Sequence, residues 1–422
     1  MERVIENKAV HYRILFAGLF IFALTLPLSK SISSIILALA YAYLLAVAAY
    51  DRNFREAIIR HIRQPLSIPI ILFVLIAFSR SLFSKNLMEG MNFVKQVSNL
   101  LAVYLIVSVV INTHDENKRR DVTENLLLFF LAGIAILDLL GFLTYFGVIG
   151  NKKHLLPVTP LNMHHIWAGN LNALGLYVSA SLLLFSSSRS MPRRIFASVF
   201  PVIGVISVLL STSRTAWVGI LCTAGISLFF LITNRRTYLI SSALITMGAI
   251  GLYFFSDIIH TRIDQIFKDF SLFLSGVTAT SVGERLLMWK AALKMFFSNP
   301  IFGVGPGDYK STLAGFVAAG EFPGAILKYN QPHSIYLFSL AATGLVGFLS
   351  LLFIFYRALQ CSGRLLREKK RLFGFLALTV SVHFMTAGFT ESLLNIHVLT
   401  CSFALIAGVS MQRPCLAQSA PV

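Results

Sequence analysis

Twelve long apolar runs joined by mostly short connections dominate this 422-residue sequence. A helix needs about 20 predominantly apolar residues to cross a bilayer. Apolar residues make up 56% of the chain and charged residues only 13%, against roughly 25% charged in soluble domains. The sequence therefore predicts an all-α integral membrane protein with about twelve transmembrane helices. The expected spans are 14–29, 31–50, 66–83, 97–112, 126–148, 170–186, 195–212, 215–233, 238–255, 333–356, 372–390 and 395–412.

One connection differs from the others, because residues 256–332 form a long polar interval between the ninth and tenth spans. We expect three regions: 1–255 with helices 1–9, 256–332 as an extramembrane loop with amphipathic helices, and 333–422 with helices 10–12 and a tail. Within the loop, apolar residues at helical spacing over 263–274 predict a helix that lies along the membrane surface. Ser281 and Glu284 fit a capping box that would start a second helix, ending near Asn299.

Basic residues in the short connections predict the orientation, because cytoplasmic loops retain the excess of Lys and Arg. The connections on one side carry 22 Lys and Arg, and the short connections on the other side carry 7 when Arg80, at the outer end of the span 66–83, is included. Both termini are therefore expected in the cytoplasm and the 256–332 loop on the extracytoplasmic side, which is the periplasm in a cell with two membranes. The net charge of +18 does not form a soluble basic face, so we expect no nucleic-acid partner.

Three residues that could carry chemistry are expected at the outer face. Arg214 lies between two spans with no acid nearby in the sequence, and Arg285 lies in the second loop helix. His333 opens the tenth span, and histidine is the side chain suited to accept a proton near neutral pH. Each also has a structural interpretation: Arg214 as a turn anchor, Arg285 as a surface ion pair, and His333 as an interfacial capping residue.

Other polar residues have less specific interpretations. Arg80, Lys85 and Lys95 lie at or near the outer face, where they could bind the phosphorylated part of a lipid or extend toward the interface without a ligand. Within the spans, Asp138, His383 and His397 are interpreted as helix-packing groups. No D-x-D or similar carboxylate cluster lies on the outer face, so neither a divalent metal nor a cofactor is expected. The GVGPGDY motif at 303–309 lacks the strand and helix of a dinucleotide site, and predicts a tight turn.

Four segments together resemble the O-antigen ligase family, within the wider O-antigen ligase and polymerase superfamily. They are SRTAW at 213–217, GERLLMWKAAL at 283–293, NPIFGVGPGDY at 299–309 and PHSIYLFSLAATGLVG at 332–347, in the family's order and around its long outer loop. The resemblance covers mainly the C-terminal half. Where this chain has His333-Ser334, the family often has His-Asn.

The resemblance implies a GT-C-like membrane glycosyltransferase with no metal or cofactor. It implies transfer of an O-polysaccharide from undecaprenyl pyrophosphate to a sugar hydroxyl of lipid A-core, with Arg214, Arg285 and His333 essential. The residue types fit this chemistry, because guanidinium groups pair well with phosphate oxygens. His333 would remove the proton of the acceptor hydroxyl, and Arg80 and Lys85 would contact substrate.

Alternative functions remain open from the sequence. An O-antigen polymerase and a protein O-oligosaccharyltransferase of the same superfamily use a similar donor with a different acceptor. Polymerases tend to have two large outer loops, and this chain has one, which favours the ligase. A polytopic transporter and a non-catalytic assembly protein are alternatives from other classes, although no repeated halves are evident.

Overall fold

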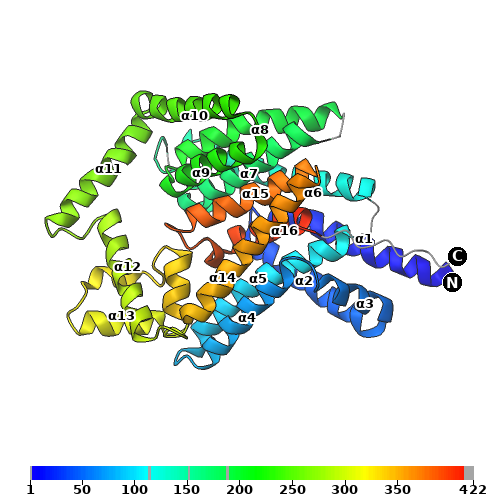
Figure 1. Ribbon diagram of the computed structural model, residues 1–422, viewed down its shortest axis with the longest axis horizontal. Coiled ribbons are helices and arrows are strands. Elements are labelled where there is room, and N and C mark those ends of the chain that lie inside the picture. Colours follow the sequence, from blue (N-terminus) through cyan, green and yellow to red (C-terminus); the bar gives the residue numbers. More distant parts are fainter. Residues whose placement is uncertain (1, 113–115, 151–152, 187–189, 413–422) are drawn as a thin grey trace.

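The protein is an all-α integral membrane protein in a computed structural model that describes residues 2–112, 116–150, 153–186 and 190–412 (Figure 1). Twelve of its helices are apolar and match the twelve expected spans one for one, and eight of them are long and apolar enough to cross a membrane. The twelve are α1 (Glu2–Thr25), α2 (Lys30–Tyr50), α4 (Ser67–Leu82), α5 (Leu87–Ile111), α6 (Glu116–Tyr145), α7 (His165–Phe185), α8 (Met191–Leu210), α9 (Arg214–Leu231), α10 (Arg235–Phe255), α14 (Ile335–Arg367), α15 (Arg371–Ala387) and α16 (His397–Ser410).

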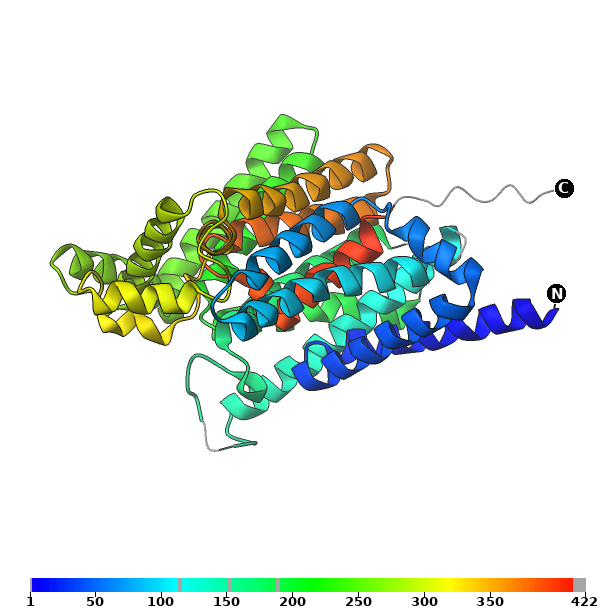
Figure 2. The ribbon, with the colours of Figure 1, turned by 90° about the horizontal axis from the view of Figure 1, so that it is seen from below.

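The remaining helices are polar or short, and most of them lie between α10 and α14. They are α3 (Arg52–His61), α11 (Asp257–Leu274), α12 (Ser281–Ser298), α13 (Tyr309–Ala318) and the 3₁₀ turns η1 (Pro160–Asn162), η2 (Gly324–Lys328) and η3 (Leu393–Asn395). We call α11, α12, α13 and η2 the helical arm. The arm projects from one end of the bundle, and the start of α1 and the end of α16 lie toward the other end (Figure 2).

The centre of the bundle is α16, whose residues are buried along the whole helix. It packs against α5, α7 and α15. A buried histidine of the neighbouring helix α15 has hydrogen-bond partners on both ring nitrogens, as hydrocarbon surroundings favour. His383 contacts the Tyr177 hydroxyl at 2.9 Å and the Asn170 side-chain oxygen at 3.0 Å. The packing role predicted for His383 is thus what the structure shows.

A glycine-rich contact joins the arm to the bundle, and we call it the glycine junction. α14 contains a break at Gly344, where φ is 66° and ψ is −164°. The loop after α12 enters this break: the Val304 and Gly305 amides donate to the carbonyls of Ala341 and Ala342 at 2.8 and 3.0 Å. A Cβ on Gly303 would lie 2.6 Å from the Ala341 carbonyl oxygen. The GVGPGDY motif is therefore a tight turn with close backbone packing, as expected.

Two predicted boundaries were wrong. The expected connection 357–371 is helical as far as Arg367, because α14 continues beyond the apolar run into a polar last turn. The α12 helix is capped by Thr280, whose hydroxyl accepts from the Gly283 amide at 3.0 Å, and not by the Ser281 capping box. Glu284 is instead turned toward η2. The predicted tail, 413–422, lies outside the described residues.

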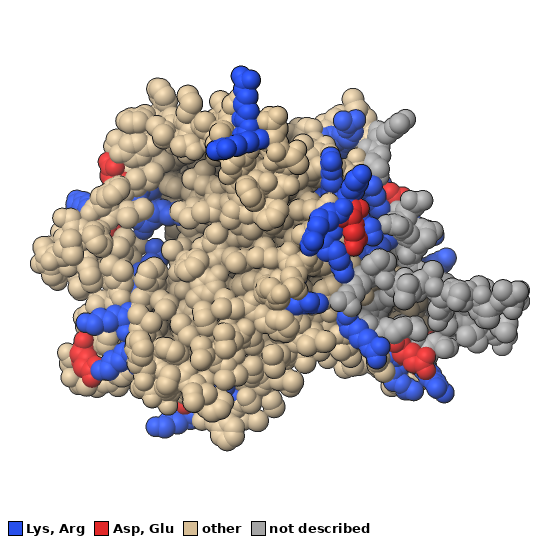
Figure 3. Space-filling model, viewed as in Figure 1, with Lys and Arg blue, Asp and Glu red and all other residues tan. Residues whose placement is uncertain are grey.

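Charge is distributed unevenly along the bundle axis. Figure 3 shows Lys and Arg side chains gathered at the end of the bundle away from the arm, and fewer over the arm itself. Apart from Lys and Arg side chains at its upper edge, the middle of this face is free of Lys and Arg. An uncharged band between two charged ends is the pattern of a protein that crosses a bilayer.

Candidate active site

The arm brings three arginines together at the end of α9. Ser213 caps α9 by accepting from the Ala216 amide at 3.3 Å, which places Arg214 in the first turn at the mouth of the bundle. Its Nη2 donates to the Ser281 hydroxyl of α12 at 3.1 Å. Its Nη1 is buried and has no hydrogen-bond partner among the described residues. A buried guanidinium nitrogen without an acceptor is costly, and this cost would be removed by an anionic ligand.

Arg262 on α11 and Arg285 on α12 complete what we call the arginine cluster (Arg214, Arg262 and Arg285). Arg214 interacts electrostatically with both of the others, and so do Arg262 and Arg285 with each other. Burial, followed by the charge of Arg285, lowers the pKa of Arg262. Arg285 is half-buried and makes no hydrogen bond or ion pair within the described part of the chain. The predicted surface ion pair of Arg285 is therefore not formed there.

His333 pairs with a carboxylate that the sequence did not point to. Its Nδ1 lies 3.0 and 3.1 Å from the two carboxylate oxygens of Glu391, in the turn between α15 and α16. The Glu391 side chain is 1% exposed and that of His333 is 19% exposed. Burial raises the pKa of Glu391, but the hydrogen bond and charge of His333 outweigh it, so the pKa is lowered overall. Glu391 therefore remains ionised at neutral pH.

The backbone around His333 is held firmly in an uncommon conformation. Its φ is 51°, in the left-handed region that few non-glycine residues adopt. The Trp289 indole N–H donates to the Pro332 carbonyl at 3.0 Å, and the Ile335 amide donates to the Gly388 carbonyl at 2.9 Å. Backbone strain of this kind concentrates at functional sites, where surrounding contacts maintain it. The contacts fix the imidazole between α12 and α15.

The His333–Glu391 pair and the arginine cluster belong to one electrostatic neighbourhood. The charge of Arg285 acts on Glu391. His164, the residue before α7, interacts electrostatically with the same residues. Burial lowers the pKa of His164, Glu391 raises it, and His333 and Arg285 lower it further. Figure 3 shows an opening between the arm and the bundle, with Lys and Arg side chains at its edge. The predicted trio of Arg214, Arg285 and His333 thus lies on one side of the bundle around shared charges.

Another acid near the site, Glu284, has a structural role. Glu284 of α12 accepts from the Lys328 ammonium at 2.8 Å and from the Tyr329 hydroxyl at 2.6 Å. Burial raises the pKa of Glu284, and these two hydrogen bonds lower it to below its ordinary value. The Tyr329 ring in turn lies edge-on to His333, with centroids 5.3 Å apart. Glu284 therefore fixes η2 and supports one side of the imidazole.

Arg80 and Lys85, the other predicted substrate-binding residues, lie at the glycine junction. The Arg80 guanidinium donates to the Gly303 carbonyl at 3.4 Å and sits over the Phe302 ring at 5.5 Å. The amide of Lys85 donates to the Asp308 carboxylate at 2.9 Å, and its side chain is exposed. No hydrogen bond or ion pair within the described residues joins either of them to the arginine cluster.

This arrangement of residues can bind an anion and can also accept a proton. The buried Asp269 carboxylate acts on Arg214 and Arg262. Three guanidinium groups against this one carboxylate leave an excess of positive charge, which suits a polyanion such as a pyrophosphate. If the imidazole donates its Nδ1 proton to Glu391, then Nε2 carries the lone pair and can accept a proton. Among the described residues, no group of three or more His, Cys, Asp and Glu side chains is placed to hold a metal ion.

Comparison with known proteins identifies the segment that builds this site. Residues 198–352 match a family model described as O-antigen ligase. This segment of the chain is therefore similar to the O-antigen ligase family. This match includes all three residues of the arginine cluster and His333, and it stops before Glu391.

A curated protein of Haemophilus influenzae, described only as uncharacterized, is 28% identical over 195 residues. The aligned part is 45% of this chain and 49% of that protein, so the chain spans about half the length of the curated relative it matches. The family domain and the bundle together describe a multi-pass membrane protein with a ligase or polymerase type of domain.

Two residues of the site were missed from the sequence. Glu391 stands alone between two apolar spans, with no neighbouring motif to mark it, although an isolated carboxylate at a span end on the outer face was a usable signal. Arg262 is one of several charges on an amphipathic helix, and no pattern separates it from the solvated ones. Both enter the site only through tertiary packing.

Proposed function

We propose that the protein is an O-antigen ligase, which transfers an O-polysaccharide from undecaprenyl pyrophosphate to a sugar hydroxyl of lipid A-core. The observation that carries this proposal is the arginine cluster, with its unpartnered guanidinium nitrogen, beside a histidine that is paired to a buried carboxylate. The family domain supports the same reaction. The site would lie on the periplasmic face of the bacterial inner membrane, with both termini in the cytoplasm, as the Lys and Arg counts favour.

The reaction follows from the placement of these groups. His333 Nε2 accepts the proton of the acceptor hydroxyl, and Glu391 stabilises the imidazolium that results. The hydroxyl oxygen bonds to the anomeric carbon of the donor as the bond from that carbon to the pyrophosphate oxygen breaks. The configuration at carbon inverts, and undecaprenyl pyrophosphate leaves as an anion. The arginine cluster stabilises the negative charge that grows on the leaving group, which is usually the largest catalytic contribution. Positive charge from the chain fills the role that a divalent metal has in other transferases.

The test is a transfer assay with purified protein, a defined lipid-linked glycan donor and lipid A-core. We expect His333→Ala to lower turnover by about 100-fold to 10,000-fold, the range for loss of a general base. His260→Ala is the matched control, because His260 is an exposed arm residue paired to Asp264. A wild-type rate for His333→Ala would remove His333 as the base, and loss of activity with a chelator would contradict a metal-independent reaction.

Two further measurements with the same assay refine the result. Glu391→Gln keeps a hydrogen-bond acceptor for the imidazole but removes the charge that stabilises the imidazolium, so turnover is expected to fall by about tenfold or more while KM stays close to wild type. Replacing lipid A-core by a lipid-linked repeat unit distinguishes a ligase from a polymerase, because transfer to the repeat unit alone would assign the polymerase reaction.

A further inference from the structure

A second polar region lies within the bundle, next to the start of α16. It is a cavity of about 790 Å³ lined by residues of α2, α4, α5 and the start of α16. Its volume falls in the range of small-molecule and lipid sites. The exposed lysines Lys30 and Lys95 line it, from α2 and α5 respectively. Both lysines act electrostatically on His397, which identifies them as neighbours of the same pocket wall.

The polar lining is concentrated at one end of the cavity. His397 Nε2 lies 3.1 Å from the Ser33 hydroxyl of α2, and the Asn99 amide of α5 lies 3.3 Å from His397 Nδ1. This contact brings α2, α5 and α16 together. Gln96 donates from its amide to the Thr400 hydroxyl at 3.0 Å. The cavity's polar end is therefore built from lysines, amides and a histidine, and His397 does more than pack between helices.

The opposite end of the cavity is apolar. Along α5 the lining changes from Lys95 and Asn99 to Leu101 and Leu105, and along α2 it changes from Lys30 to Leu37 and Ala38. Both helices start at the polar end, which is the end of the bundle nearer the arm, and Lys95 lies about 12 Å along α5 from its first residue. Lysines and amides open to a bilayer are costly without a polar partner. A lining that is cationic near the interface and apolar at depth matches an anionic amphiphile.

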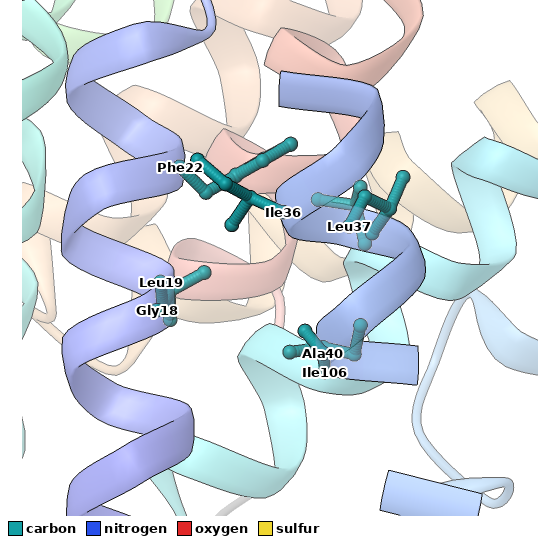
Figure 4. A pocket seen from close by; sticks show the side chains of 8 residues that line it. Gly18, Leu19, Phe22, Ile36, Leu37, Ala40 and Ile106 are labelled. Atoms are coloured by element: carbon teal, nitrogen blue, oxygen red, sulfur yellow. The ribbon is translucent and has the colours of Figure 1, made fainter. Parts of the chain in front are cut away.

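The α2 wall of the cavity is fixed from behind. Leu19 and Phe22 of α1 face Ile36, Leu37 and Ala40 of α2 across an apolar contact (Figure 4). This contact encloses only about 10 Å³ of free space. Leu37 belongs to both surfaces. Because α2 is packed against α1, the larger cavity is a preformed feature of the bundle, and it does not depend on a ligand to separate the helices.

We propose that this cavity binds the acceptor lipid by its phosphorylated sugar end, with the acyl chains toward Leu101 and Leu105. Lys30 and Lys95 bind phosphate oxygens, and Gln96 and Asn99 bind sugar hydroxyls. This inference rests on the proposed function for the identity of the lipid. The cavity is separate from the arginine cluster. The pyrophosphate of the donor and the phosphate of the acceptor lipid therefore do not compete for the same cations.

The geometry connects the cavity to the site of transfer. Glu391, which holds His333, and His397, which lines the cavity, are six residues apart. Their Cα atoms are therefore at most about 20 Å apart. Asn395, between them, donates to the Gln331 side chain at 3.0 Å, two residues before His333. A glycolipid anchored in the cavity can extend its outer sugars along this segment, toward the imidazole.

The test measures equilibrium binding by the full chain in phosphatidylcholine nanodiscs, without a donor. The probes are a diphosphorylated hexa-acyl glucosamine disaccharide, the same lipid without phosphate, and phosphatidylglycerol. We expect the phosphorylated glycolipid to bind most tightly and the Lys30→Gln, Lys95→Gln double variant to bind it at least about tenfold more weakly. Ala38→Trp, which fills the cavity without changing charge, should also abolish binding. Lys310→Gln is the matched control, because Lys310 is exposed on α13 away from the cavity.

The outcomes separate a failure of the cavity proposal from a failure of the proposed chemistry. Unchanged glycolipid binding in the double variant and in Ala38→Trp overturns the proposal, provided that both variants keep the wild-type unfolding temperature. Binding of phosphatidylglycerol equal to that of the glycolipid overturns the assignment to the acceptor. His333→Ala should bind the glycolipid normally. If His333→Ala also transfers glycan normally, the proposed chemistry fails while the cavity assignment stands on its binding data.

Discussion

The glycine junction and the arginine cluster lie on the same end of the bundle, and they differ in how their charged groups are surrounded. At the junction, Arg80 has a backbone carbonyl and an aromatic ring of the chain around it, and Asp308 accepts from two backbone amides. At the cluster, three guanidinium groups face one another, and Nη1 of Arg214 has no acceptor among the described residues. Nε of Arg80 is also buried without an acceptor among the described residues, so the two regions differ in the amount of positive charge that they concentrate. The junction holds one arginine, whereas the cluster brings three together.

The difference shows that the resemblant motifs have two kinds of role. Some hold the backbone together, and others supply charged groups to the candidate site. The GVGPGDY and ATGLVG segments are next to the candidate site in the sequence, yet their glycines serve the backbone contact between the arm and α14. The SRTAW and GERLLMW segments supply the unpaired cations instead. A motif that is satisfied by its own chain is interpreted as architecture, and one that concentrates uncompensated charge is interpreted as a binding site.

The largest expected effect comes from breaking the junction with Gly344→Ala. The residue has a φ of 66°, and an added Cβ would lie 2.3 Å from the Ile301 carbonyl oxygen. Backbone cannot move aside as a flexible side chain does, so we expect a loss of about 3 kcal/mol or more in the free energy of unfolding. Thermal unfolding in detergent measures this loss. Gly315→Ala is the control, because nothing lies within 4 Å of its Cβ position. Equal stability of both variants would contradict the junction.

A smaller effect is expected from Glu284, which ties η2 to α12. Its folded pKa lies below the ordinary value of 4.5, so the stability that it contributes is present above that pH. This stability is lost as the pH falls through the lowered folded pKa. In Glu284→Gln we expect the unfolding temperature to be less sensitive to pH below about 4.5, with a change under about 1 kcal/mol. If the unfolding temperature of the variant falls at acid pH in the same way as that of the wild type, the Lys328 and Tyr329 contacts contribute nothing to stability.

Much of the fold follows from local sequence, because a long apolar run in a bilayer can satisfy its backbone only as a helix. The positions of the twelve apolar helices were predictable for this reason. The break at Gly344 and the extension of α14 to Arg367 were not, because they depend on the loop that packs into the break and on a polar turn beyond the bilayer.

The residues of the candidate site were likewise predictable only in part. Arg214, Arg285 and His333 were predictable, since each lies in one of the resemblant motifs. Glu391 and Arg262 have no local signal and reach the site through the packing of α15 and α11. Lys95 had two interpretations from the sequence, and the cavity adds that it lies beside Lys30 and His397.

The central claim is that the arginine cluster binds the pyrophosphate of the donor and the junction does not. The most direct measurement is the affinity of purified protein for undecaprenyl pyrophosphate, compared between Arg285→Lys and Arg80→Lys, with Arg52→Lys on the exposed α3 helix as the control. Lysine keeps the charge but loses the bidentate fork. We expect Arg285→Lys to weaken binding by about tenfold to a hundredfold and Arg80→Lys to leave it close to the wild type. Equal weakening by both substitutions, or by neither, would contradict the claim.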